Sequence, residues 1–270
     1  MAENEAPKPD PAFDPRIPPK EKPNDKSHIG KVIAVISGKG GVGKSTVTGL
    51  LASAAARTGA RVGIMDSDIT GPSMPKTFGV TTRLGTDGEG LIPSETAHGI
   101  KMVSTNLVLE RDDMPVVWRG PILSNVVRQF FSETNWGDID YLFVDMPPGT
   151  ADVTLTAFQA LPIDGVVVVT SPQDLVEMIV DKAVNMAREM DVPLIGIVEN
   201  MAAFTCPDCG KTHYLFGEPK GRKLAEERSI PSYATLPIDP RVAQLEDAGR
   251  IEEADEDEAL KPLLDIILER

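Results

Sequence analysis

A glycine-rich stretch of ten residues constrains this chain more than any other part of it. Residues 37–46 read SGKGGVGKST, and from Gly38 onward the spacing is G-x-x-x-x-G-K-S. An apolar run at residues 32–36 precedes the stretch, and helix-forming residues follow it from Ser45. Glycines let a backbone approach a ligand closely, and successive N–H groups at a helix N-terminus attract an anion. The pattern therefore predicts a phosphate-binding loop between a strand and a helix.

The side chains of this loop predict a nucleotide bound with Mg²⁺. Lys44 would neutralise the β- and γ-phosphates, while Ser45 offers a hydroxyl ligand to the cation. The minimal pattern does not require Lys39, which is either a solvated surface lysine or the second lysine of the deviant Walker A class that the motif resembles. In that class this lysine reaches phosphates bound by the opposite subunit of a dimer. The loop residues expected at the nucleotide are Gly38, Lys39, Gly40, Gly41, Val42, Gly43, Lys44, Ser45 and Thr46.

Carboxylates stand at the end of the next apolar run. Residues 61–65 predict a buried strand that leads into Asp66 and Asp68. Together with the loop and its helix, this strand completes the start of a βαβ unit. Ligands of such folds bind at the carboxyl ends of the strands, so we expect both carboxylates to face the nucleotide. The alternative is an Asx turn followed by a helix cap.

Further apolar runs extend the predicted sheet. Residues 141–144 end at Asp145, an acid placed to hold a water of the Mg²⁺ shell, and the Gly149 N–H could sense a γ-phosphate. Two more strands are expected at residues 165–170 and 193–198, separated by a helix, and a final helix at Asp257–Leu268. Residues 106–117 are expected to form an irregular strand or hairpin. The fold class predicted is α/β, a P-loop NTPase with a mostly parallel sheet flanked by helices on both faces.

The two cysteines of the chain lie together in one loop. Cys206 and Cys209 form a C-x-x-C pair, which is too closely spaced to brace a fold. Such a pair can bind zinc, bind an iron–sulfur cluster or act as a redox dithiol, and a metal site of either kind normally needs about four ligands. His213 could be a third ligand. A second copy of the chain would supply the missing ligands.

Composition and net charge limit which partners and which cellular location are expected. Residues 1–28 are rich in proline and charge, which predicts a disordered arm before an ATPase domain at 29–270 that carries the C-x-x-C loop. The net charge of −14 disfavours nucleic acid and anionic membranes as partners, although much of the acid lies in residues 246–258, which we interpret as a solvated segment. No signal peptide or membrane span is recognisable, so the chain is expected to be cytoplasmic.

Four features in this order resemble the Mrp/ApbC-type iron–sulfur carrier ATPases of the MinD/ParA-like superfamily. The resemblance covers the chain from about Gly30 to the C-terminal helix. Two internal signatures, at residues 118–121 and 199–201, are also similar to that family. The four features are the loop with Lys39, the run from Asp66 through Asp68 to Ser73, the run from Asp145 through Gly149 to Thr150, and the pair Cys206 and Cys209.

The resemblance implies a role for each site residue. Lys44 and Ser45 would bind the phosphates and Mg²⁺, Lys39 would cross the dimer, and Asp68 would polarise the attacking water. The remaining implied roles are water-mediated Mg²⁺ binding by Asp66 and Asp145, adenine contact by Asn200, flanking of the base near Pro237, and ligation of one 4Fe–4S cluster by Cys206 and Cys209 of two subunits.

The function expected is a homodimeric ATPase with slow, regulatory hydrolysis that passes a shared 4Fe–4S cluster to apo-proteins. One alternative is a positioning ATPase of the partition or septum-site type, which moves on DNA or membrane. Another is an ATP-dependent iron–sulfur reductase, although the cysteines of the nitrogenase iron protein lie far apart in sequence. A dimer joined by zinc is the structural alternative.

Overall fold

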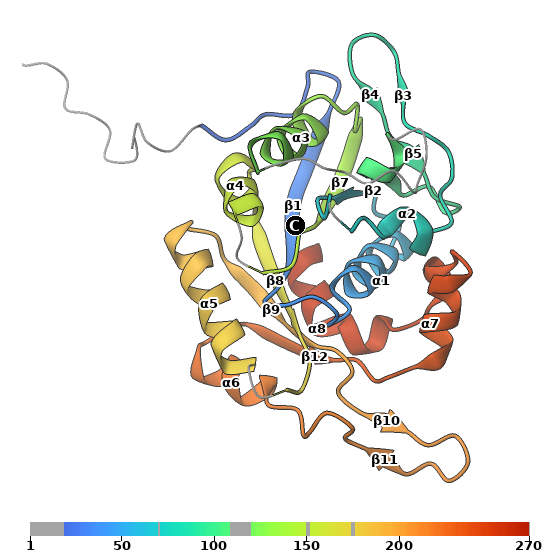
Figure 1. Cartoon of the computed structure of the whole chain (residues 1–270), viewed down its shortest axis with the longest axis vertical. Coiled ribbons are helices and arrows are strands. Elements are labelled where there is room, and N and C mark those ends of the chain that lie inside the picture. The colour runs from blue at the N-terminus through green and yellow to red at the C-terminus, as the bar shows by residue number, and fades with distance from the viewer. Residues whose placement is uncertain (1–18, 70, 109–119, 150–151, 174–175, 270) are drawn as a thin grey trace, which may run out of the picture.

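A single eight-stranded sheet organises the chain (Figure 1). The computed structural model describes residues 19–69, 71–108, 120–149, 152–173 and 176–269. All neighbouring strands pair in parallel except the last two, which are antiparallel. The predicted α/β fold with a mostly parallel sheet is therefore confirmed. The strands lie in the order β12 (Ser232–Thr235), β9 (Leu194–Glu199), β8 (Gly165–Thr170), β1 (His28–Ser37), β7 (Asp138–Asp145), β2 (Val62–Asp66), β6 (Lys101–Val103) and β5 (Ser94–Glu95).

Helices cover both faces of the sheet, so its central strands are buried on both sides. Alternate residues of β1 belong to opposite cores: Val32 and Ala34 pack on one face, and Ile33 and Val35 on the other. This double burial explains why the central strands read as continuous apolar runs. One face carries α3 (Gly120–Ser132), α4 (Asp152–Ala160), α5 (Val176–Glu189) and α6 (Gly221–Glu227). The other carries α1 (Lys44–Arg57), α2 (Met74–Thr77), α7 (Pro240–Asp247) and α8 (Asp257–Leu268).

The observed secondary structure differs from the expected one mainly in its short elements. The region expected as an irregular strand or hairpin at residues 106–117 begins instead with a 3₁₀ turn, η1 (Thr105–Leu107), and residues 109–117 lie outside the described residues. Helix α6 and strand β12 have too little apolar periodicity to predict. The other small elements are η2 (Ile251–Glu253), the hairpin of β3 (Gly85–Thr86) with β4 (Leu91–Ile92), and the hairpin of β10 (Phe204–Thr205) with β11 (Thr212–His213).

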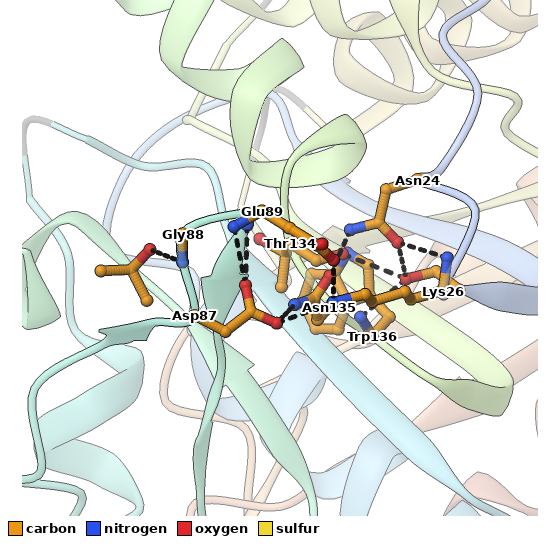
Figure 2. A network of polar contacts seen from close by, with 11 residues as sticks. Asn24, Lys26, Asp87, Gly88, Glu89, Thr134, Asn135 and Trp136 are labelled. Atoms are coloured by element: carbon orange, nitrogen blue, oxygen red, sulfur yellow. Dashed lines mark hydrogen bonds and ion pairs between the residues drawn. The ribbon is translucent and has the colours of Figure 1, made fainter.

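The segment just before β1 makes specific contacts with the domain (Figure 2). The Asn24 Nδ2 donates to Asn135 Oδ1 at 2.6 Å, and the Lys26 Nζ lies 2.9 Å from Asp87 Oδ2. The Asn135 Nδ2 donates to the same Asp87 oxygen at 2.9 Å, which joins the segment to the β3–β4 turn. Residues 19–27, which belong to the predicted arm, therefore lie against the domain before β1 begins at His28. Residues 1–18 lie outside the described residues.

Among the helices that the structure describes, none combines the length and the apolar composition needed to cross a bilayer.

Candidate functional site

The phosphate loop joins the carboxyl end of β1 to the first turn of α1. Gly41 and Gly43 have φ of 79° and 80°, values that L side chains rarely adopt. A Cβ at Gly43 would also lie 2.2 Å from Asn200 Nδ2, so both the backbone conformation and the available space require glycine at this position. Among the described hydrogen bonds, none uses a backbone N–H of residues 40–45 as a donor within the chain. These N–H groups are therefore available to an anion, as the sequence pattern predicts.

A cavity of about 370 Å³ opens above this loop. Lys39, Lys44, Ser45 and Asp68 all line it, so the structure brings together the phosphate-loop side chains and the expected hydrolytic carboxylate. Gly38, Val42, Asp66 and Asp145 lie outside the lining. The remaining lining residues are Ser37, Gly40, Gly41, Gly43, Thr46, Ser73, Lys76, Thr77, Pro148, Glu246 and Asp247.

Lys44 and Asp145 form the charged centre of the site. The Lys44 Nζ lies 2.7 Å from Asp145 Oδ1, and both residues are almost fully buried, at 6% and 0% exposed. The Ser45 hydroxyl donates to Asp145 Oδ2 at 2.6 Å, and the Thr48 hydroxyl donates to Oδ1 at 2.8 Å. Asp145 therefore holds the two loop side chains that the sequence assigns to phosphate and Mg²⁺. Hydroxyl and carboxylate oxygens are the donor set that Mg²⁺ prefers, so these residues fit that cation.

Asp66 is buried beneath the cavity, next to Asp145. The two residues are direct partners in the pairing of β2 with β7. Asp66 accepts hydrogen bonds from the Met74 N–H at 3.3 Å and the Ser104 hydroxyl at 3.1 Å, and its Oδ1 accepts the Asp68 N–H at 3.2 Å. The contact between the Asp68 N–H and Asp66 Oδ1 has the geometry of an Asx turn, which is the alternative that the sequence left open for these residues. Burial, reinforced by the charge of Asp145, raises the pKa of Asp66 to about 8.

This raised pKa predicts a pH dependence of stability that an Asp66→Asn variant would lack. Between about pH 4 and pH 8 the folded chain holds a proton on Asp66 that the unfolded chain releases. The free energy of unfolding should therefore fall as pH rises, with this group contributing up to about 1.4 kcal/mol per pH unit. Urea denaturation of nucleotide-free protein in a chelator, from about pH 5.5 to 7.5, measures the slope. Parallel slopes for the two proteins would contradict the shift.

Lys39 contacts its own chain in the structure. Its ammonium group donates to Gln173 Oε1, in the loop after β8, and its carbonyl accepts the Ser37 hydroxyl at 3.0 Å. A role across a dimer would require this lysine to leave Gln173. Lys39 also lines the phosphate cavity.

Gly149, the glycine expected to sense a γ-phosphate, is hydrogen-bonded to the last residue of β1. Its N–H donates to the Ser37 carbonyl at 2.8 Å, and its φ is 86°. The turn after β7 is therefore tied to the start of the phosphate loop, and Pro148 of the same turn lines the cavity. Thr150 lies outside the described residues.

A second, smaller cavity of about 150 Å³ adjoins the first and is lined mainly by apolar groups. Asn200 and Pro237 both line it, so the two residues expected at the adenine lie together. The Asn200 Nδ2 also donates to the Val42 carbonyl at 3.0 Å, which fixes the amide against the phosphate loop. Thr46 and Glu246 line both cavities. A nucleotide with its phosphates in the first cavity and its base in the second would extend over this pair of residues.

Glu246 is a site residue that sequence reasoning missed. It lies near the end of α7, and its Oε1 accepts the Thr46 hydroxyl at 2.7 Å. Burial raises its pKa above the ordinary value. The interpretation of residues 246–258 as a solvated segment is wrong here, because Glu246 is half-buried at the site and Glu252 is only 6% exposed. No motif marks Glu246, since it stands in an acidic stretch that composition alone assigns to the surface.

The thiol pair lies on the β10–β11 hairpin, which projects from the body of the molecule (Figure 1). Both cysteines are free, with Cys206 partly exposed and Cys209 exposed. Hydrogen bonds from the backbone N–H groups of Cys209 and Asp208 lower the pKa of the Cys206 thiol, which favours the thiolate needed for metal binding. Within the described part of the chain, no three His, Cys, Asp or Glu side chains gather as a metal site. His213 is therefore not placed as a third ligand beside the thiols.

A short covalent path connects the nucleotide cavity to the thiols. Asn200 directly follows β9 and contacts the phosphate loop, and only a few residues separate it from Cys206. The path is held by hydrogen bonds from the Ala202 N–H to the Leu236 carbonyl at 2.9 Å and from the Ile238 N–H to the Ala203 carbonyl at 2.7 Å. Both partner segments belong to the wall of the second cavity. The wall of the second cavity is therefore hydrogen-bonded to the segment that leads into the hairpin.

Comparison with known proteins identifies relatives across nearly the whole chain. The family model ParA, described as NUBPL iron-transfer P-loop NTPase, matches residues 28–269. An iron-sulfur cluster carrier protein of Clostridium perfringens is 46% identical over 90% of this chain and 87% of its own length. A second protein of that name, from Saccharolobus solfataricus, is 48% identical over 80% of this chain and 74% of its own length.

Solved structures agree with this assignment. A nucleotide-binding protein of Archaeoglobus fulgidus, in complex with ADP and with cobalt found in it, is 44% identical, with a TM-score of 0.78 over 85% of this chain and 90% of its own. The cell division ATPase MinD of Pyrococcus furiosus is 19% identical with a TM-score of 0.60 over 88% of this chain and 98% of its own, a likeness of fold alone. On these matches the chain belongs to the family of iron-transfer P-loop NTPases.

Proposed function

We propose that this protein is an iron–sulfur cluster carrier that binds and slowly hydrolyses ATP. It acts as a homodimer that shares one 4Fe–4S cluster and delivers that cluster to apo-proteins. The observation that carries the proposal is the path from the phosphate loop through Asn200 to the hairpin of Cys206 and Cys209. The relatives named as cluster carriers support the same function.

The shared cluster follows from the number of thiols. Each chain offers Cys206 and Cys209, whereas a 4Fe–4S cluster takes about four thiolates. The described residues group no further ligand with the pair. A two-fold dimer would place the same pair on both sides of its axis and complete the ligand set. An exposed hairpin suits this role because the cluster stays accessible to an acceptor protein.

The nucleotide site would use its residues in separate roles. Lys44 and the loop N–H groups would bind the phosphates, and Asp68, on the cavity wall, would orient and polarise the attacking water. Ser45 would bind Mg²⁺, with Asp66 and Asp145 acting through water, and the cation would neutralise charge on the phosphates. Lys39 would turn from Gln173 to phosphates bound by the second subunit. Asn200 and the segment at Pro237 would hold the base.

Cluster transfer to an acceptor tests the proposal directly. The protein is loaded anaerobically with iron and sulfide, repurified, and mixed with an apo form of a 4Fe–4S enzyme in the presence of an iron chelator. We expect the acceptor to regain its activity at a rate that depends on the loaded protein and exceeds that with free iron and sulfide. Failure of the loaded protein to restore the acceptor, while free iron and sulfide do so, would reject the carrier function.

The same assay tests whether nucleotide binding changes the rate at which the thiol hairpin transfers its cluster. Addition of ATP with Mg²⁺ should change the transfer rate of the native protein, because the wall of the base cavity contacts the path to the hairpin. An Asn200→Ala variant, which loses the bond to the Val42 carbonyl, should load its cluster normally and respond less to ATP.

A further inference from the structure

Three consecutive large apolar side chains are exposed directly after the thiol hairpin. Tyr214, Leu215 and Phe216 are 50%, 61% and 43% exposed, and they follow the last residue of β11. Isolated apolar residues on a surface need no explanation, but a contiguous group marks an interaction site. We call these three residues the apolar seam.

The apolar seam continues the surface that carries Lys39. A Cβ on Gly217, the next residue, would lie 3.7 Å from the Pro172 carbonyl. Pro172 precedes Gln173, the residue that accepts the Lys39 ammonium group. The residue that follows the seam therefore lies beside the loop that contacts Lys39.

The charge of this segment suits contact with an identical segment. Residues 204–217 contain one acid, Asp208, and one base, Lys211, so their formal charge is −1 + 1 = 0 in a chain of net charge −14. Two whole chains repel one another, whereas two neutral segments can meet without a like-charge penalty. An acidic or basic partner would instead be recognised by a segment of opposite charge.

We infer that the apolar seam is the surface on which a second copy of this chain packs around the shared cluster. The inference rests on the proposed function, because the shared cluster places the two-fold axis between the thiol hairpins. Each Tyr214, Leu215 and Phe216 then lies near its symmetry mate and beside the cluster. Burial of the seam stabilises the dimer, and it slows the loss of iron to a chelator because the thiolates of both chains stay together.

A double substitution of Leu215 and Phe216 to aspartate tests this inference in the full chain. The cysteines are unchanged, so each chain keeps its thiols. After anaerobic loading, we expect the dimer of the double variant to dissociate about tenfold or more readily and to lose iron to a chelator about tenfold or more rapidly. Native mass and sedimentation measure the dimer, and absorbance with iron counting measures the loss. Unchanged ATP binding shows that the variant is folded.

Ile92→Asp is the matched control, because Ile92 is 44% exposed on β4, far from the hairpin in Figure 1. It should behave like the native chain in both measurements. If the native chain itself fails to take about one cluster per two chains, the proposed function fails. If the native chain takes it and the double variant matches the native dimer and its iron release, the inference fails while the function stands. A double variant that stays dimeric but cannot transfer its cluster would assign the seam to the acceptor protein and overturn the inference.

Discussion

Replacing Lys44 by alanine is expected to reduce ATP hydrolysis by about a thousandfold or more. The Lys44 ammonium group is the cation at the base of the phosphate cavity, 2.7 Å from Asp145 and only 6% exposed. The other lysines of the cavity lining are Lys39, hydrogen-bonded to Gln173, and Lys76, in helix α2. Neither occupies the position of Lys44, so neither can replace its charge on the β- and γ-phosphates.

The thiol hairpin gives this substitution an internal control. Cys206 and Cys209 make no described contact with Lys44, so cluster loading of the variant should match that of the native chain. Removing the lysine also leaves Asp145 buried without its counter-charge, although the Ser45 and Thr48 hydroxyls still donate to it. Thermal unfolding therefore accompanies the hydrolysis assay. A folded variant that hydrolyses ATP at the native rate would refute the assignment of the loop.

Asp68→Asn separates binding from chemistry at the same site. An amide at residue 68 can still hydrogen-bond on the cavity wall but polarises water poorly, so nucleotide binding should persist while hydrolysis slows by about a hundredfold. Measurement of ATP affinity and single-turnover hydrolysis distinguishes this variant from Lys44→Ala, which should lose both. Loss of affinity in both variants would place Asp68 in nucleotide binding instead.

The main features of the fold were predictable because its sheet is parallel and doubly covered. Strands buried on both faces appear in the sequence as apolar runs, and their carboxyl ends meet at one edge. The loop after β1, Asp66 at the end of β2 and Asp145 at the end of β7 therefore had to lie close together, and the register of β2 with β7 pairs Asp66 with Asp145. The register also explains why Asp66 is buried and has a raised pKa. That burial depends on the packing of Met74 and Ser104, which no motif shows.

Elements with weak periodicity were not predictable. Strand β12 is only four residues long, and α6 begins at Gly221, where the Lys220 and Gly221 N–H groups donate to the buried Glu199 carboxylate. This cap comes from a strand more than twenty residues earlier, so local sequence gives no sign of it. Glu246 was missed for the same reason, because only the folded chain brings α7 to Thr46.

The apolar seam shows a different limit of sequence reasoning. A run of three large apolar residues usually predicts a buried strand, and only the structure shows that Tyr214, Leu215 and Phe216 remain outside the core. The C-x-x-C motif, by contrast, was visible at once. The structure adds the hairpin that holds the pair, the N–H groups that favour the Cys206 thiolate, and the path from Asn200.

Replacing Cys206 by alanine is expected to abolish stable cluster binding, because a dimer would then offer only the two Cys209 thiolates where a 4Fe–4S cluster takes about four. The native chain should bind about one cluster per two chains, and the cluster should join those chains. The cluster-free variant should therefore shift toward monomer, unless ATP holds the dimer through Lys39. Anaerobic native mass spectrometry with iron counting, with and without ATP, measures both the cluster content and the shift toward monomer. The Cys209→Ala variant should behave like the Cys206→Ala variant. A monomer that retains a whole cluster, or a dimer that holds two independent clusters, would refute the shared site.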